Sequence, residues 1–147
     1  MSAVLKLALS VAVLAATAAA AQAPAPYAEG QVWEYRARAG EEGSLVRIQR
    51  IEDRPAPAPG PVYHVAIVGV RLGGPGGQTD LPHLPVSRRT LDASVTRLSG
   101  RAASFPNSDE GMAEWRRAAG GVFTLPLAEI VAIVDQAVRA ANAKPEQ

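Results

Sequence analysis

The stretch VYHVAIVGV, residues Val62–Val70, decides the fold, because both of its alternating faces are apolar. A strand of this kind is typical of the interior of a sheet, where other elements cover both sides. The segment also carries one of the two histidines of the chain, His64. We therefore predict a central strand here, with His64 on the same face as Val62 and Ala66.

Two segments before this strand alternate between apolar and polar residues, as half-buried strands do. They are Gln31–Arg38 (QVWEYRAR) and Ser44–Glu52 (SLVRIQRIE), and residues 39–43 between them have the length of a hairpin turn. Ile51 falls on the opposite face from the earlier apolar positions, which predicts a β-bulge near the end of the second strand. The proline-rich residues 54–61 lack the N–H groups that a sheet ladder needs.

A glycine-rich loop is predicted after the central strand, at Leu72–Asp80 (LGGPGGQTD). It lacks the Gly-Lys-Ser/Thr sequence of a phosphate-binding loop, so we interpret it as a plain connection. Leu81–Val86 is then extended, because Pro82 and Pro85 constrain it.

Three helices are predicted in the second half. The first is capped by Ser87 and runs to about Leu98. The second covers Asp109–Ala119 and ends at two glycines. The third, Leu127–Ala141, has the clearest apolar stripe, with Thr124 as its cap. Strands followed by helices indicate an α+β fold, an antiparallel meander of three to four strands with the three helices packed on one face.

The N-terminal residues have the three-part pattern of a secretory signal peptide. Lys6 is followed by the uncharged run Leu7–Ala21 and an A-x-A cleavage signal ending at Ala23. The run is shorter than the roughly 20 residues of a spanning helix. We predict a signal peptide at residues 1–23, a linker at 24–30, a single domain at 31–141 and a flexible tail at 142–147. The location is then periplasmic or secreted, with no stable membrane span after cleavage.

Charge and cysteine content exclude several functional classes. The chain has a net charge of +1, and Lys6 is the one charge of the predicted leader, so the remaining chain is neutral. A neutral domain gives no electrostatic reason to bind nucleic acid. The absence of cysteine excludes disulfides and thiolate metal sites. An exported domain without cross-links must be stabilised by its hydrophobic core.

The two histidines define the candidate sites for chemistry. His64, His83 and Asp80 could supply three zinc ligands, but no HExxH spacing is present and we predict no metal and no cofactor. A nucleophilic triad could use Ser87, with His83 or His64 as the base and Asp80 or Asp92 to orient it. There is no G-x-S-x-G motif, however, and Ser87 is better explained as a helix cap. Arg88-Arg89 and Arg116-Arg117 would bind an anion if both pairs faced one groove. The candidate binding residues are His64, His83, Asp80, Ser87, Arg88 and Trp115.

A resemblance covers most of residues 24–147. The strings LPHLPVS, LDASVTRL and EWRRAAGGVFTLPLAEIV, together with GQVWEYRAR and VYHVAIVGV, resemble a group of small exported bacterial proteins without an assigned activity. The resemblance implies no activity and assigns no functional residue.

Three functional hypotheses follow from the sequence. The first is a non-enzymatic exported domain that binds a protein or another envelope component, because no catalytic signature is present. The second is a small hydrolase or metal-dependent enzyme built around His83, Asp80, Ser87 and His64. The third is a periplasmic inhibitor or immunity-type protein.

Overall fold

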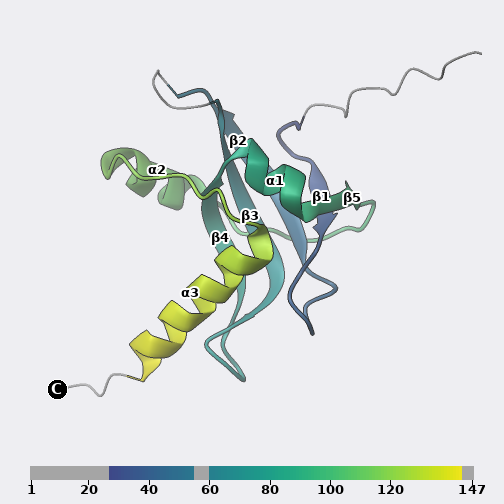
Figure 1. The fold of residues 1–147 in the computed structure, drawn as a ribbon, viewed down its shortest axis with the longest axis vertical. Helices are drawn as coiled ribbons and strands as arrows, with labels where there is room; N and C mark the ends of the chain where they lie inside the picture. Colours follow the sequence, from purple (N-terminus) through teal and green to yellow (C-terminus); the bar gives the residue numbers. More distant parts are fainter. Residues whose placement is uncertain (1–26, 55–59, 144–147) are drawn as a thin grey trace, which may run out of the picture.

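One antiparallel sheet organises the protein. The computed structural model describes residues 27–54 and 60–143, and the sheet order is β4-β3-β2-β1-β5 (Figure 1). The strands are β1 (Val32–Tyr35), β2 (Leu45–Glu52), β3 (Val62–Leu72), β4 (Gln78–Val86) and β5 (Val95–Leu98), and the helices are α1 (Arg88–Ser94), α2 (Asp109–Arg117) and α3 (Leu127–Asn142). The predicted α+β class is confirmed. The predicted meander is β1 to β4, and β5 is one strand more than expected.

The predicted signal peptide, residues 24–26 of the predicted linker and residues 144–147 of the predicted tail lie outside the described residues. The rest of the predicted linker packs on the domain. Tyr27 contacts the rings of Trp33 and Tyr63 edge-on, and its hydroxyl donates a hydrogen bond to Asp92. Within the described residues, none of the helices combines the length and the apolar character that crossing a membrane requires.

The strand β3 lies inside the sheet, between β2 and β4, as its apolar sequence predicts. Tyr63, Val65 and Ile67 belong to the main hydrophobic core. Helices α1 and α3 close this core with side chains that are fully buried, namely Leu91, Leu127, Ile130 and Val131.

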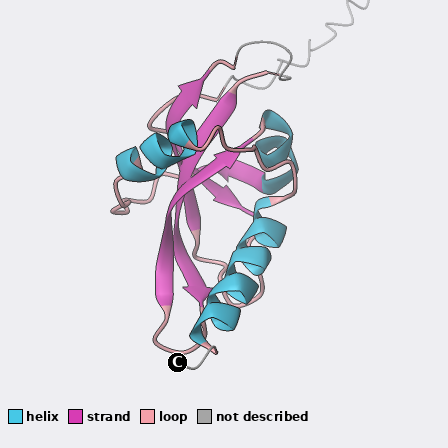
Figure 2. Cartoon of the chain, turned by 90° about the vertical axis from the view of Figure 1, so that its left-hand side faces the viewer, coloured by secondary structure: helices cyan, strands magenta, loops and turns pink. Residues whose placement is uncertain are grey.

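Helix α2 lies on the opposite side of the sheet from α1 and α3 (Figure 2). The prediction that all three helices pack on one face is therefore wrong for α2. The reason lies in β3, which also buries His64 and Ala66 on its second face. Those side chains need a cover of their own, and α2 supplies it with Trp115, whose ring meets the ring of His64.

The first predicted helix is too long. Ser87 is its N-cap, as predicted, and its hydroxyl accepts a hydrogen bond from the Thr90 amide. The helix ends at Ser94, however, and residues 95–98 form β5, which pairs with β1. Val95 and Thr96 are β-branched and favour strand geometry, and the edge of β1 offers them backbone partners.

The strand interruptions and boundaries match the sequence predictions only in part. The predicted bulge in β2 is confirmed, because the register shifts between Ile48 and Arg50. The predicted glycine loop is shorter than expected, since β4 already begins at Gln78. Pro82 and Pro85 are tolerated in β4 because it is an edge strand.

The first turn of helix α3 is capped by a side chain from another helix, which the sequence did not indicate. Pro126 occupies the N-cap position, and the amide of Leu127 donates to the hydroxyl of Ser94, at the end of α1, at 2.8 Å. Thr124, the predicted cap, makes no side-chain bond to the helix. The contact between α1 and α3 brings the end of one helix to the start of the other.

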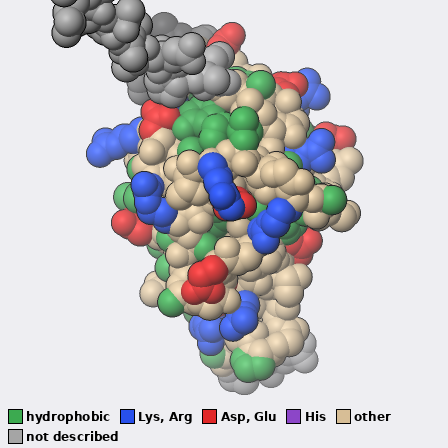
Figure 3. All heavy atoms as spheres, turned by 90° about the vertical axis from the view of Figure 1, so that its right-hand side faces the viewer, with side chains coloured by type: hydrophobic (Ala, Val, Ile, Leu, Met, Phe, Trp, Pro, Cys, Tyr) green, Lys and Arg blue, Asp and Glu red, His purple; other side chains and the backbone are tan. Residues whose placement is uncertain are grey.

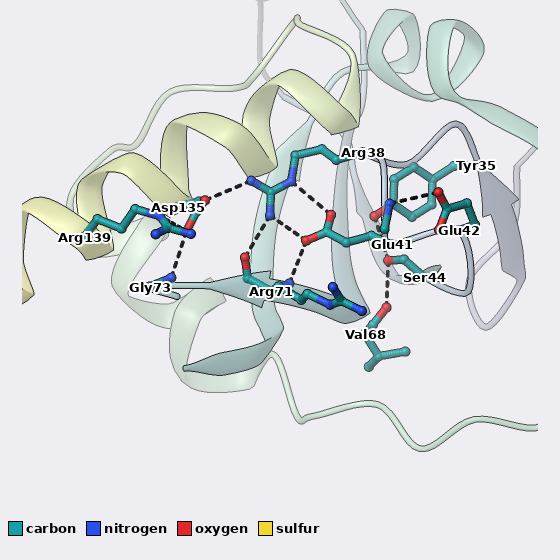
Figure 4. A network of polar contacts seen from close by, with 11 residues as sticks. Tyr35, Arg38, Glu41, Glu42, Ser44, Val68, Arg71, Gly73, Asp135 and Arg139 are labelled. Carbon is teal, nitrogen blue, oxygen red and sulfur yellow. Dashed lines mark hydrogen bonds and ion pairs between the residues drawn. The ribbon is translucent and has the colours of Figure 1, made fainter. Parts of the chain in front are cut away.

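A buried network around Arg38 ties α3 to the sheet (Figure 4). The guanidinium donates to both carboxylate oxygens of Glu41, to Asp135 at 3.1 Å and to the carbonyl of Arg71 at 2.8 Å. Asp135 also accepts from the Gly73 amide at 2.8 Å. We call these residues the Arg38 network. It joins the β1–β2 turn, the end of β3 and the middle of α3.

Candidate functional site

Two histidines from neighbouring strands form the centre of the candidate site. His64 of β3 and His83 of β4 approach through Nδ1 and Nε2, respectively, at 2.8 Å. Their rings are stacked, with centroids 5.0 Å apart and planes inclined by 21°. The β3–β4 ladder shifts register between Val65 and Ile67, in the region that carries both rings. The structure thus places the two histidines that the sequence singles out in direct contact.

Glu52 and Arg116 extend the histidine pair. Glu52, at the end of β2, lies 3.1 Å from His64 Nε2 through its Oε2 atom. Its other oxygen accepts from the guanidinium of Arg116 on α2, with Nε at 2.9 Å. We call Glu52, His64, His83 and Arg116 the His64 network. The network joins the three neighbouring strands β2, β3 and β4 to helix α2.

The carboxylate fixes the proton positions along this network. Hydrogen bonds from Arg116, followed by those from His64, hold the pKa of Glu52 below its usual value, so it is ionised and can only accept. His64 therefore carries its proton on Nε2, and its Nδ1 accepts the proton of His83 Nε2. This leaves His83 Nδ1 as a free acceptor, because no hydrogen bond joins it to another described residue.

Both imidazoles are neutral at pH 7. Burial is the largest influence on each ring, and it lowers the pKa of His64 and lowers that of His83 to about 4. The neighbouring His64 ring and Arg116 lower the pKa of His83 further. The site therefore presents a neutral ring with a lone pair rather than a cation.

Trp115 is held rigidly above His64. Its ring meets the His64 ring edge-on at 4.8 Å, and its indole N–H donates to the carbonyl of Gly121 at 2.8 Å. Arg54 lies over the indole at 5.6 Å. A Cβ atom at Gly120 would come within 2.3 Å of the indole, so only glycine fits at that position.

Helix α2 approaches β4 through a second glycine. A Cβ atom at Gly111 would lie 2.6 Å from the Cβ atom of His83. The absence of a side chain at this position lets the helix backbone rest against the imidazole. The small residue therefore sets the distance between α2 and β4.

A shallow groove of about 640 Å³ runs between β4 and α2, beside His83. Its apolar lining comes from Pro82, Pro85, Pro106 and Trp115, and its polar lining from residues of α2 and Asn107. A second hollow of about 350 Å³ continues it past Trp115 and Pro85 to Val122 and Phe123. We call the two together the α2–β4 groove.

Three predicted site residues lie apart from the histidines. The Ser87 hydroxyl accepts from the Thr90 amide at 3.2 Å, Arg88 pairs with Asp92, and Asp80 lies opposite Val68 in the sheet. Among the described residues, no hydrogen bond or ion pair joins these three side chains to an imidazole. The predicted constellation therefore reduces to His64, His83 and Trp115.

The two arginine pairs do not form the anion patch that the sequence allowed. Arg116 is paired with Glu52, and Arg117 with Glu114 on its own helix. Arg88 is likewise neutralised by Asp92. Three of the four guanidinium groups are therefore paired with carboxylates, and only Arg89 makes no ion pair among the described residues.

Sequence reasoning missed Glu52 and Gly111, and it named Arg116 only as part of an anion-binding pair. Glu52 pairs with Val62 across the β2–β3 ladder. Val62 lies two residues before His64 in β3, so the side chains of Val62 and His64 are on the same face of the sheet. That register could have been predicted only by adding the β2 bulge to the count. No local signal connects Arg116 or Gly111 to the histidines, because α2 reaches them through tertiary packing.

Within residues 27–54 and 60–143, no group of three or more histidine, aspartate or glutamate side chains is arranged to hold a metal ion. No family model matches the chain, and no curated protein or solved structure shows significant similarity to it. The site's own geometry therefore carries the functional argument.

Proposed function

We propose that the chain is a small exported binding protein, and that its α2–β4 groove holds an extended, apolar segment of a partner protein. The sequence pattern of residues 1–23 supports export. The observation that carries binding is the groove itself, a hollow open along its length and lined by three prolines and a tryptophan. Aromatic-lined grooves are a recurring docking site for extended peptide segments.

The rigidity of the lining supports this function. Trp115 is fixed by His64, Gly121 and Arg54, and the proline rings have no rotamers to lose. A surface that is already ordered loses little conformational entropy on binding. Buried aromatic anchors of this kind carry most of the binding energy in many interfaces.

The imidazole adds a directional acceptor to the groove, beside Asn107 and the charged side chains of α2. His83 Nδ1 is an acceptor without a partner among the described residues, and it accepts an N–H group from a bound segment. Neutral His64 and ionised Glu52 hold the ring in this tautomer. A fixed acceptor of this kind sets the orientation and register of a peptide backbone.

The enzymatic alternative has one feature in its favour. Glu52, His64 and His83 form a chain that orients an imidazole, as a general base requires. A hydrolase also needs a nucleophile within hydrogen-bond reach of that base. Ser87, the predicted nucleophile, is bonded to Thr90 instead. The geometry therefore favours binding, with the inhibitor or immunity-type role as one form of it.

Selection from a displayed library of random 12-residue peptides on the purified chain tests the proposal. We expect enrichment of extended apolar sequences whose binding shifts the NMR signals of Trp115 and His83. Trp115→Ala should weaken the selected peptides by about 30-fold, the loss typical of a central aromatic anchor. Gly111→Ala should weaken them as well, because the added Cβ atom displaces α2 from His83.

The matched controls are Leu98→Ala, an exposed apolar residue on β5, and Gly100→Ala, where a Cβ atom has open space. Neither should change peptide affinity. Equal affinity for the wild-type chain and Trp115→Ala, with both folded by circular dichroism, would contradict the proposal. Turnover of an ester or amide substrate that is lost in His83→Ala would favour the hydrolase instead.

A further inference from the structure

A separate polar pocket lies on the α2 face of the sheet, between β2 and the loop that leads into α2. Its volume is about 250 Å³. Strand β2 contributes Arg47, Gln49 and Arg50, and the remaining lining comes from Phe105, Pro106, Asn107, Ser108, Asp109 and Met112. Unlike the α2–β4 groove, this pocket is mainly polar.

Arg47 is the unusual residue in this pocket. Its Nε atom is buried and has no hydrogen-bond partner, and it is the one side-chain atom in the described structure with that status. A buried, charged donor without an acceptor is unfavourable. The rest of the chain avoids the situation, since Arg38, Arg116 and Arg139 each hold a carboxylate.

The neighbours of Arg47 do not neutralise it. Among the described residues, Arg47 forms no ion pair within 4.0 Å. Arg50 pairs only with the exposed Glu29, whose carboxylate lies 4.0 Å from the Arg50 guanidinium. Gln49 donates to the carbonyl of Pro106 and closes the loop over the pocket. Asp109 is the one acidic residue in the lining, so two arginines and one aspartate give the lining a formal charge of +1.

We infer that this pocket binds a small oxyanion, a carboxylate or a phosphate group, through Arg47 and Arg50. A planar guanidinium binds both kinds of oxyanion in the same way, with two parallel N–H donors. An oxyanion of this size fits the pocket and supplies the counter-charge that the Arg47 guanidinium lacks. The pocket shares Pro106 and Asn107 with the α2–β4 groove, but Arg47 and Arg50 do not line that groove, and Trp115 and His83 do not line this pocket.

NMR observation of arginine Nε–H signals tests the inference directly. The purified chain is titrated with inorganic phosphate and, separately, with acetate, at ionic strength held constant with sodium chloride. We expect a saturable shift of the Arg47 Nε–H signal, together with the amides of Asn107 and Ser108. Tighter binding of phosphate assigns a phosphoryl ligand, and tighter binding of acetate assigns a carboxylate.

Three variants make the test specific. Arg47→Gln should weaken the preferred ion by at least tenfold. Arg89→Gln removes the same charge at an exposed residue that makes no described ion pair, and should change nothing. Asp109→Asn should strengthen binding several-fold by removing the opposing charge, and it keeps the test valid even if Arg47→Gln fails to fold.

Shifts that rise linearly without saturation for both ions would overturn the inference. Equal affinity in Asp109→Asn and the wild-type chain would also overturn it, because an ion in this pocket must sense that carboxylate. Loss of peptide binding in Trp115→Ala has no bearing on either outcome.

Discussion

The two polar networks of this protein differ in how completely their hydrogen-bonding groups are satisfied. In the Arg38 network, every carboxylate oxygen of Glu41 and Asp135 accepts at least one hydrogen bond. The His64 network instead ends at His83, a lining residue of the α2–β4 groove whose Nδ1 atom has no hydrogen-bond partner among the described residues. A closed network holds elements together, whereas an open one leaves a group available to a ligand.

The charge states of the two networks differ in the same sense. In the Arg38 network, the Gly73 amide, then Arg38 and Arg139, hold the pKa of Asp135 below its usual value. In the His64 network, burial lowers the pKa of both imidazoles and keeps them neutral. Ionic bonding therefore dominates one region, and neutral hydrogen bonding dominates the end of the other that faces the groove.

Removing Glu41 should have the largest effect on stability. Glu41→Ala takes away the acceptor of two Arg38 bonds and of the Arg71 amide at 2.6 Å. Breaking a buried ion pair from one side costs about 3 to 5 kcal/mol. Because Arg38 remains partly accessible to water, with 22% of its side chain exposed, we expect about 3 kcal/mol, measured by urea denaturation.

The neighbouring Glu42→Ala is the matched control. Glu42 is exposed and accepts one bond from the Gly40 amide, so its loss should cost less than about 1 kcal/mol. The groove should keep its peptide affinity in both variants. An equal loss of stability in the two variants would contradict the structural role assigned to the Arg38 network.

Acid should destabilise the protein through the His64 network, over a defined range of pH. In the unfolded chain the histidines titrate near 6.5, whereas His83 in the folded protein titrates at about 4. Between these values the unfolded chain binds more protons, so stability falls as pH falls from 6.5 to 4. Above 6.5 both states are neutral, and this contribution is constant.

The pH profile of the urea midpoint measures this effect, with His83→Gln as the test variant. Its slope between pH 6.5 and 4 should be shallower than that of the wild-type chain. The contribution of Glu52 to stability is lost at lower pH, as the pH falls below 4.5, the usual pKa of a glutamate. An unchanged slope between 6.5 and 4 in His83→Gln would show that His83 is protonated equally in both states.

The sequence predicted the strands well because their patterns are local. The two-faced apolar run of β3, the slip in β2 and the Ser87 cap each depend on residues within one segment. The helix prediction for residues 95–98 was wrong because Leu98 completes an apolar stripe at helical spacing. These residues form a strand because the edge of β1 is open to pair with them. Pairing between distant segments is not encoded in local periodicity.

The candidate site was predicted in part for the same reason. His64 and His83 were found as the two histidines of the chain, and Trp115 as an aromatic residue on a helix. Ser87 and Asp80 were close to His83 in sequence, but β4 and its continuation into α1 separate their side chains from it. Glu52 and Arg116 lie far away in sequence and meet the histidines only after the sheet and α2 have assembled.

Replacing Arg116 should have the smallest effect on stability and a specific effect on the His64 network. The Arg116 side chain is 48% exposed, and exposed ion pairs add little to folding. We therefore expect Arg116→Gln to unfold at nearly the same urea concentration as the wild-type chain. Its hydrogen bond is, however, the largest cause of the lowered pKa of Glu52, so that pKa should rise toward its usual value.

Carbon-13 NMR titration of the Glu52 carboxyl group measures the change, and Arg117→Gln is the control because Arg117 pairs with Glu114 instead. The control should leave the pKa of Glu52 where it is. In Arg116→Gln, Glu52 becomes protonated at a higher pH, and His64 Nε2 then loses its ionised acceptor. The free nitrogen of His83 would shift in the same pH range. If it did not respond, the three groups would titrate independently, and the open network would be two separate hydrogen bonds rather than one connected chain.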